Sequence, residues 1–240
     1  MAKKKAAPAA PAGTGTIAGG KPSAAPSFPP LAPKSQSDVT STVLLEDQIL
    51  LLDNLFSYEE CRRFVKFIDG LPLELTPPKK RGEAVRVNHR LSITSVNFAE
   101  QFFEVIKPHL PLFPYPASRK RPNATARAAH SLNSNIRLYK YTPSQHFGQH
   151  YDDAVRDTET GATSEWTLLV YLTGAEDGVQ GGETIFYTSD KGKSSSAIVA
   201  PLTRGTVLLH RHGHDCLLHE GSQVRSGIKY VLRSDVMFVD

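Results

Sequence analysis

The C-terminal part of the chain decides the fold, and it reads TVLLH at residues 206–210 and IKYVLRSDVMFV at residues 228–239. Both runs are rich in apolar and β-branched side chains, and Gly and Ser separate them. Similar short runs precede them at residues 136–141, 167–172, 184–187 and 197–200. Short strands with frequent turn signals and no interleaved helices are typical of an antiparallel sandwich or barrel. We therefore expect a β-sandwich over residues 133–240.

Residues 43–132 carry helix signals as well. The Ser-x-x-Glu capping box at residues 57–60 opens one amphipathic helix, and the Asn-x-x-Glu box at residues 97–100 opens a second. An apolar run at residues 43–52 predicts one or two buried strands around a charged turn. The predicted fold class is mainly β with flanking helices (α+β), in which the N-terminal helices pack on one side of the β core. Residues 43–240 should form one globular unit.

The first 42 residues have a different composition. Ala, Pro and Gly make up 21 of the first 40 residues, so this segment has little apolar surface to bury, and we expect a disordered tail. The tail lacks the apolar core of a signal peptide, and no window approaches 18 consecutive apolar residues. Two cysteines suit a reducing compartment. These features predict a cytoplasmic or nuclear protein that does not cross a membrane.

The charge distribution argues against a nucleic-acid partner. The net charge is +4, but the first 40 residues hold five lysines and one acid, so the remaining 200 residues carry 23 basic and 23 acidic side chains. A protein that binds phosphates through its folded part should be basic there. We therefore predict a peptide or small-molecule substrate and no nucleic-acid partner.

A metal site is suggested by the histidines. His150 and Asp152 stand at i and i+2, a spacing that points both side chains to the same face of a strand. A facial triad of two His and one carboxylate leaves coordination positions open on Fe(II). With nine histidines in the chain, one His-x-Asp pair alone has about an even chance of arising by accident. The candidates for the second histidine are His210, His212, His214 and His219.

Four ordered blocks add context to this pair. Tyr141 precedes His150 by nine residues, a Thr-Leu-Leu-Val-Tyr-Leu run at 167–172 precedes Gly-Gly-Glu-Thr-Ile-Phe at 181–186, and His219 precedes Lys229 by ten residues. In these blocks the sequence resembles the 2-oxoglutarate- and Fe(II)-dependent dioxygenases, specifically their prolyl 4-hydroxylase-like branch. The resemblance covers about residues 133–240, nearly half the chain, and it favours His219 over the other three histidines because only His219 has the Lys ten residues later.

The resemblance implies a double-stranded β-helix, or jelly roll, with Fe(II), 2-oxoglutarate and O2 as its requirements and ascorbate as an accessory reductant. The expected iron ligands and catalytic centre are His150, Asp152 and His219. The expected contacts with 2-oxoglutarate are Lys229, which pairs with the distal carboxylate, and Tyr141, Tyr171 and Thr167. Arg233 shares the parity of Lys229, so it is either an alternative anchor or part of an ion pair with Asp235 or Glu220.

Two geometric expectations accompany these assignments. A hairpin turning near Val224 would place His219 and Lys229 opposite each other on paired strands. The polar loop at residues 86–90 could cover the mouth of the site, although we expect it to be solvated.

The predicted function is hydroxylation of an unactivated C–H bond, coupled to decarboxylation of 2-oxoglutarate to succinate and CO2. A peptidyl proline is the leading candidate substrate, and a small metabolite is the alternative. A cupin-like jelly roll that binds a metal or ligand without turnover is the alternative outside enzymes, but it would not need Lys229 beside Tyr141. A nucleic-acid-repair oxygenase would need a net positive charge on its folded part, whereas residues 41–240 of this chain are neutral.

Overall fold

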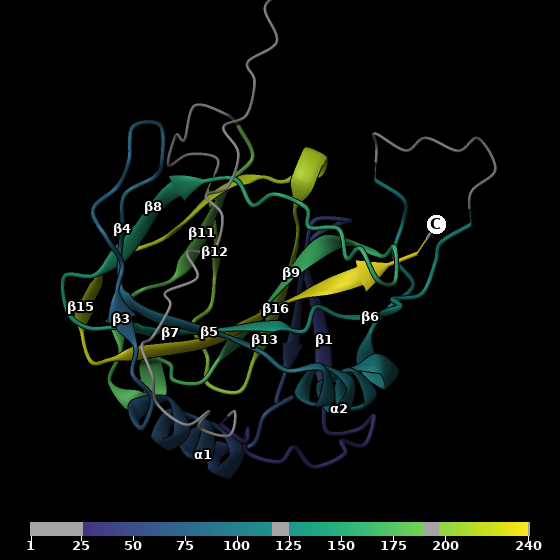
Figure 1. Cartoon of the computed structure of the whole chain (residues 1–240), viewed down its shortest axis with the longest axis horizontal. Helices are drawn as coiled ribbons and strands as arrows, with labels where there is room; N and C mark the ends of the chain where they lie inside the picture. The colour runs from purple at the N-terminus through teal and green to yellow at the C-terminus, as the bar shows by residue number, and fades with distance from the viewer. Residues whose placement is uncertain (1–25, 117–124, 190–196, 240) are drawn as a thin grey trace, which may run out of the picture.

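The computed structural model describes residues 26–116, 125–189 and 197–239, and within them two antiparallel sheets face each other (Figure 1). The larger sheet has nine strands, in the order β1 (Thr40–Leu45), β2 (Ile49–Asp53), β13 (Val207–Arg211), β9 (Thr163–Tyr171), β16 (Lys229–Phe238), β7 (Asn135–Tyr141), β5 (His89–Thr94) and β3 (Glu74–Leu75), with β6 (Ser131–Leu132) beside β16. The smaller sheet has five, in the order β12 (Ala197–Ala200), β11 (Thr184–Tyr187), β14 (Leu218–Gly221), β8 (His146–His150) and β4 (Arg86–Val87). Strands β10 (Gln180–Gly181) and β15 (Val224–Ser226) pair to form a separate two-stranded ribbon.

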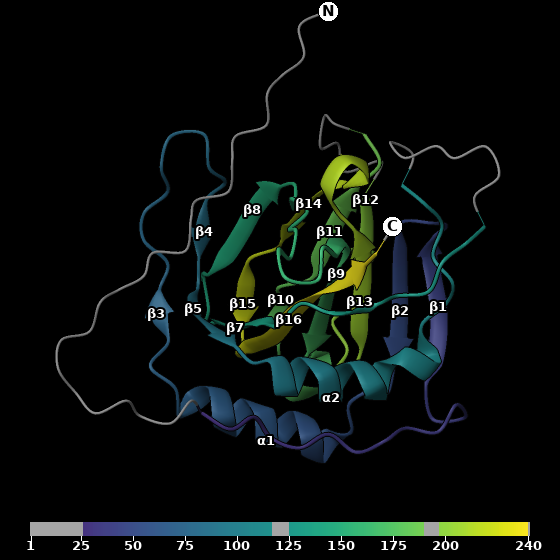
Figure 2. The same cartoon turned by 45° about the vertical axis from the view of Figure 1, so that its right-hand side comes forward.

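Two helices, α1 (Tyr58–Asp69) and α2 (Val96–Ile106), lie together on one side of the strands (Figure 2). The predicted mainly-β jelly roll with N-terminal helices packed on it is therefore confirmed. None of the helices in the described ranges is long and apolar enough to cross a membrane.

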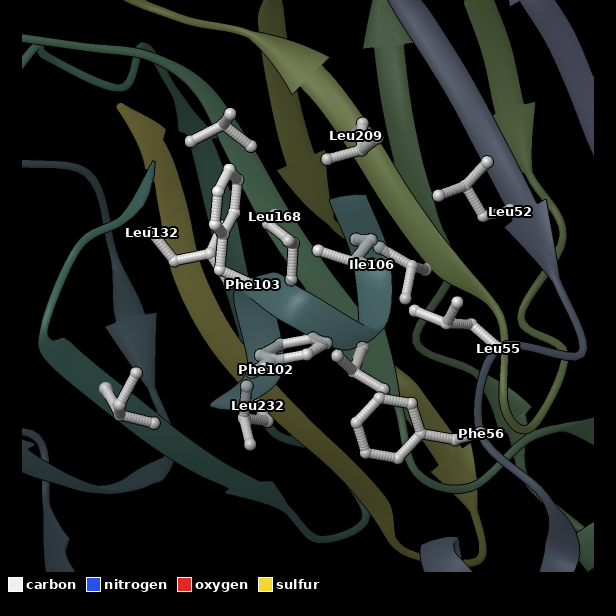
Figure 3. Packing of buried hydrophobic residues seen from close by; sticks show 14 of the residues in the cluster. Leu52, Leu55, Phe56, Phe102, Phe103, Ile106, Leu132, Leu168, Leu209 and Leu232 are labelled. Carbon is white, nitrogen blue, oxygen red and sulfur yellow. The ribbon is translucent and has the colours of Figure 1, made fainter. Parts of the chain in front are cut away.

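The central strands of the larger sheet are buried on both faces, and the alternation of their side chains explains why. In β2, Leu50 and Leu52 belong to the core shared with the helices, whereas Ile49 and Leu51 belong to the core between the two sheets. The same alternation recurs in β13 and β16, since successive side chains of a strand point to opposite faces. Figure 3 shows the helix-side core, in which Phe102 of α2 is packed among the strand leucines. Packing against the helices holds the sheet in place, and the opposite face of the sheet is available to line a site.

The two helix starts differ in how well local sequence predicts them. The capping box of α1 is present as predicted, with the Ser57 side chain accepting from the backbone N–H of Glu60. In α2 the predicted start at Asn97 is wrong, because Ser95 is the N-cap and accepts from the N–H of Phe98. Asn97 instead accepts a hydrogen bond from Gln101 one turn along the helix.

Part of the predicted tail is attached to the globular unit. Phe28 stacks on Phe98 at a centroid distance of 4.1 Å, and Lys34 Nζ lies 2.5 Å from the buried Glu60 carboxylate. Glu60 also accepts from the backbone N–H of Ala32. The predicted boundary after residue 42 is therefore wrong for residues 26–42, because a few apolar side chains and one buried ion pair hold this polar segment in place. Residues 1–25 lie outside the described residues.

Candidate active site

A pocket lies between the two sheets and encloses about 440 Å³, counted to its open mouth. Three imidazoles that line it come from strands β8, β13 and β14, and one carboxylate comes from the segment just after β8. Two cationic groups, from β16 and β4, have no salt bridge to an acid within the described ranges. These six residues are His150, Asp152, His210, His219, Lys229 and Arg86.

The predicted triad is brought together at one end of this pocket. His150 and His219 are directly opposite each other in the β8–β14 pair, and the Nε2 atom of each lies 3.7 Å from an oxygen of Asp152. The Nδ1 atoms lie 2.8 Å from the carbonyl oxygen of Gly148 and 2.9 Å from that of Leu217, respectively. With Nδ1–H donating to these carbonyls, both imidazoles present an Nε2 lone pair to the same point.

This donor set fits Fe(II). One ligand atom from each of His150, Asp152 and His219 lies within 4.8 Å of the others, and two imidazoles with one carboxylate are the ligands of non-haem Fe(II) sites. The sequence left three other histidines as candidates. His212 is buried between Thr167 and Ser164, and His214 is exposed on the turn that follows β13.

The charges of the triad are arranged for a cation. Burial alone would raise the pKa of Asp152, but the nearby Arg233 and His219 hold this pKa well below its usual range. Burial lowers the pKa of His150 to about 3, with the neighbouring His219 adding to the effect. For His219, burial opposes the charged form, yet hydrogen bonds to Asp152 and Cys216 outweigh it and raise the pKa to about 10. A divalent cation at this point would take the place of the His219 proton, since a histidine ligand must be neutral.

Asp152 is held from behind by two residues for which the sequence predicted another role. Thr167 Oγ1 donates to Asp152 Oδ2 at 2.9 Å, and Arg233 Nη1 donates to Oδ1 at 3.0 Å. Arg233 also pairs with the fully buried Asp235 at 3.2 Å. The polar groups of Thr167 and Arg233 thus orient the carboxylate of Asp152. That they contact 2-oxoglutarate stays a prediction. The predicted alternative of an Arg233–Asp235 ion pair is confirmed.

The other end of the pocket carries a buried cation. Lys229 opens β16 opposite Tyr141, the last residue of β7, and its side chain is 5% exposed. Its ammonium donates to the carbonyl oxygen of Gly182 at 2.5 Å and lies 5.4 Å from the ring centroids of Tyr141 and Tyr171. Among the described residues, no carboxylate lies within salt-bridge distance of it. Burial lowers the pKa of Lys229 to about 8, against the attraction of Glu183.

The two predicted tyrosines differ in their surroundings. Tyr141 lines the pocket beside Lys229. The hydroxyl of the fully buried Tyr171 is hydrogen-bonded to Thr184 Oγ1 at 2.7 Å, so its ring forms part of the wall while its polar atom is already engaged.

The predicted hairpin between His219 and Lys229 is wrong. Strand β14 lies in the smaller sheet between β11 and β8, whereas β16 lies in the larger sheet between β9 and β7. The intervening chain forms β15, which pairs with β10, and this ribbon carries the chain from one sheet to the other. Lys229 and His219 consequently line the same pocket from two different sheets.

Sequence reasoning gave little weight to His210, yet its side chain lines the pocket. It is 2% exposed, and its Nε2 lies 3.8 Å from Asp152 Oδ2. The signal was present in the alternation of β13: Val207 and Leu209 face the helices, so Leu208 and His210 face the second sheet.

Arg86 also differs from its prediction. Instead of lying in a solvated loop, it pairs with Phe147 in the β4–β8 ladder and lines the pocket. Its guanidinium lies 4.5 Å from the ring centroid of Tyr139 and 4.4 Å from that of Phe147, and its Nε donates to Asn88 Oδ1. The Phe147 ring is in turn stacked on His150 at 3.6 Å. Cation–π contacts hold this arginine at the pocket.

The segment that carries this site matches a known protein family. Residues 136–234 match the model of the 2OG-Fe(II) oxygenase superfamily, and they contain the three triad residues, Tyr141 and Lys229. Over these residues the chain is similar to the 2OG-Fe(II) oxygenase superfamily. Fe(II) and 2-oxoglutarate are typical of that superfamily, and the donor set described above fits them.

Solved structures share the fold of this chain at low sequence identity. The viral collagen prolyl hydroxylase of Paramecium bursaria Chlorella virus-1, in complex with 2OG, is 19% identical with a TM-score of 0.53 over 80% of this chain and 97% of its own. A prolyl-4-hydroxylase from Pseudomonas putida is 14% identical with a TM-score of 0.52 over 80% and 94%. OsALKBH1 is 13% identical with a TM-score of 0.55 over 82% and 99%. A search of curated proteins finds no match.

Proposed function

We propose that this oxygenase hydroxylates an unactivated C–H bond of a prolyl residue in a peptide, coupled to decarboxylation of 2-oxoglutarate to succinate and CO2. The observation that carries the proposal is the position of Lys229 in the same pocket as the triad: it is a buried ammonium, and no carboxylate of the described residues lies within salt-bridge distance of it. An unpaired buried charge is costly, so its presence favours an anion as its partner. A barrel that only bound a metal would have no need of this cation.

Each residue then has a role. His150, Asp152 and His219 hold Fe(II) through two Nε2 atoms and a carboxylate oxygen, and the bound metal supplies the activation of O2. Lys229 pairs with the distal carboxylate of 2-oxoglutarate, and Tyr141 flanks it. Thr167 and Arg233 keep the Asp152 carboxylate in one orientation, which preserves the geometry of the site. The enclosing sheets keep co-substrate and substrate at fixed positions.

The lining of the pocket supports a peptide substrate. Tyr139 and Phe147 contribute aromatic rings to it, and Arg86, in contact with both rings, offers hydrogen-bond donors. A prolyl ring fits an aromatic surface, and peptide carbonyls accept from a guanidinium. The prolyl hydroxylases among the solved structures agree with this choice, although at their identity they share only the fold.

Anaerobic titration tests the metal and co-substrate assignment. Adding Fe(II) and then 2-oxoglutarate to the purified protein should produce a visible metal-to-ligand charge-transfer band. His219→Ala should abolish the band because it removes one of three ligands, whereas His214→Ala, which removes an exposed imidazole, should leave it unchanged. Tight iron binding without a band would favour the non-catalytic jelly roll. Succinate release with a proline-repeat peptide and with free L-proline then separates a peptidyl from a small-molecule substrate.

Replacing Arg86 should weaken binding of the peptide substrate without changing the reaction of 2-oxoglutarate. Arg86→Gln removes a guanidinium held against Tyr139 and Phe147 in the pocket lining, so KM for the proline-repeat peptide should rise about tenfold, as expected for loss of one charge-assisted hydrogen bond of about 1.5 kcal/mol. Succinate formed in the absence of peptide should not change. The exposed Arg90 provides the matched control as Arg90→Gln. Equal KM values in both variants would mean that Arg86 is only part of the wall.

A further inference from the structure

His212 is a buried histidine that is not one of the triad residues. It follows β13 directly, is 4% exposed, and has a hydrogen-bond partner on each ring nitrogen. Nδ1 lies 2.9 Å from Thr167 Oγ1, and Nε2 lies 2.9 Å from Ser164 Oγ. Both hydroxyls belong to β9 and are fully buried. Burial outweighs the attraction of Asp235 and Asp152 and lowers the pKa of His212, so the ring is neutral and carries one N–H.

The directions of these hydrogen bonds are fixed from the Asp152 end. A carboxylate can only accept, so the Thr167 hydroxyl gives its one proton to Asp152 Oδ2 at 2.9 Å. The Thr167 oxygen must then accept from His212, which places the ring proton on Nδ1. It also accepts from Arg233 Nη2 at 3.4 Å, so both of its lone pairs are used.

Ser164 completes the chain on the other side of the ring. Nε2 of His212 is left with a lone pair, which accepts the proton of the Ser164 hydroxyl. The Ser164 oxygen accepts in turn from the backbone N–H of Val155 at 2.8 Å. Every donor in this buried chain therefore meets one acceptor, and only one tautomer of His212 satisfies it. In the other tautomer, Nδ1 would compete with Asp152 for the single proton of Thr167.

We propose that His212 is a positioning residue, which holds the Thr167 hydroxyl with its proton on Asp152 Oδ2 and thereby keeps this carboxylate ligand in one orientation. The inference rests on the proposed function, in which Asp152 binds the metal. Without the N–H of His212, the Thr167 hydroxyl is free to rotate away from the carboxylate. Loss of a partner behind a metal ligand typically costs about 10–100-fold in metal affinity. His212 acts through Thr167 and is not itself a ligand, so the site keeps its three protein ligands.

The Co(II) affinity of variants at residue 212 tests this without any turnover. His212→Leu removes the N–H that faces Thr167 and should weaken Co(II) binding about tenfold. Asparagine and glutamine separate the two ring nitrogens, because their amide nitrogens take the places of Nδ1 and Nε2, respectively. His212→Asn should therefore bind Co(II) with nearly wild-type affinity and show the wild-type visible spectrum of the bound ion. His212→Gln should bind as weakly as His212→Leu.

A double-mutant cycle tests whether His212 acts through Thr167. Thr167→Val removes the hydroxyl and should by itself weaken Co(II) binding about tenfold. Adding His212→Leu to Thr167→Val should cause no further loss, because the group through which His212 acts is already absent. Losses that add in the double variant would overturn the proposal, and so would an unchanged Co(II) affinity in His212→Leu.

The controls separate loss of position from loss of the fold and of the site. Urea unfolding of each metal-free variant shows that it is folded before Co(II) is added. If His212→Leu does not fold, the asparagine and glutamine variants carry the test, and equal affinities in these two would overturn the proposal. His214→Leu, which removes an exposed histidine two residues away, should bind as wild type does. A wild-type protein that binds no Co(II) would contradict the proposed function and this inference with it.

Discussion

Replacing Lys229 with Ala should raise the dissociation constant for 2-oxoglutarate about 100-fold. The Lys229 ammonium is buried in the pocket with no salt-bridge partner in the described part of the chain, and without it the distal carboxylate would be buried unpaired. Loss of one partner of a buried hydrogen-bonded charge pair costs about 3 kcal/mol, which corresponds to that change in affinity. The measurement is titration of the Co(II)-substituted protein with 2-oxoglutarate. Lys140→Ala, which removes a lysine paired with Asp69 outside the pocket, is the control.

The same lysine gives the affinity a pH dependence of known sign. Burial lowers the pKa of Lys229 to about 8, and only the protonated amine attracts the carboxylate. Wild-type affinity for 2-oxoglutarate should therefore be constant below about pH 8 and fall by up to tenfold for each further pH unit. Lys229→Arg keeps its charge throughout this range and should bind with a flat profile. A wild-type profile as flat as that of the arginine variant would show that another group anchors the co-substrate.

Replacing Asp235 with Ala should lower the free energy of unfolding by about 3–5 kcal/mol. Asp235 is fully buried and pairs with both Arg233 and Arg137, so its removal leaves one guanidinium with half of its partners and the other with none in the part of the chain described. Urea unfolding measures the change. Glu59→Ala breaks the exposed pair with Arg62 and should cost less than about 1 kcal/mol.

The Asp235 substitution should also weaken metal binding, because Arg233 would be free to move toward the Asp152 carboxylate that it already contacts. A variant as stable as Glu59→Ala, with unchanged Co(II) affinity, would show that Arg233 is neutralised by Asp152 alone.

Features that depend on neighbouring residues were predictable from the sequence. The capping box of α1 needs only Ser57 and Glu60, and the pair of strands around the turn after Leu45 needs only an apolar run with a polar break. The parity of β16 also placed Lys229 and Arg233 on one face. The family resemblance supplied the triad, because local spacing alone leaves His-x-Asp ambiguous.

Features that depend on distant partners were not predictable in the same way. Residues 26–42 have the composition of a disordered segment, but Phe28 stacks on Phe98 of α2 and Lys34 pairs with the buried Glu60. Asp152 was not among the partners that the sequence offered for Arg233, because this contact depends on how the two sheets meet. The sheet to which β14 belongs depends on β8 and β11, which are far from it in sequence.

The double burial of the larger sheet limits how its strands can change in length. Along β16, Lys229, Val231 and Arg233 line the pocket, whereas Tyr230 and Leu232 lie in the helix-side core. An insertion of one residue within this strand would exchange the two sets, placing a leucine near Asp152 and an arginine against the helices. Length variants of this protein should therefore survive when the added residues fall in the connections between strands, and single-residue insertions inside β16 should destroy core and site together.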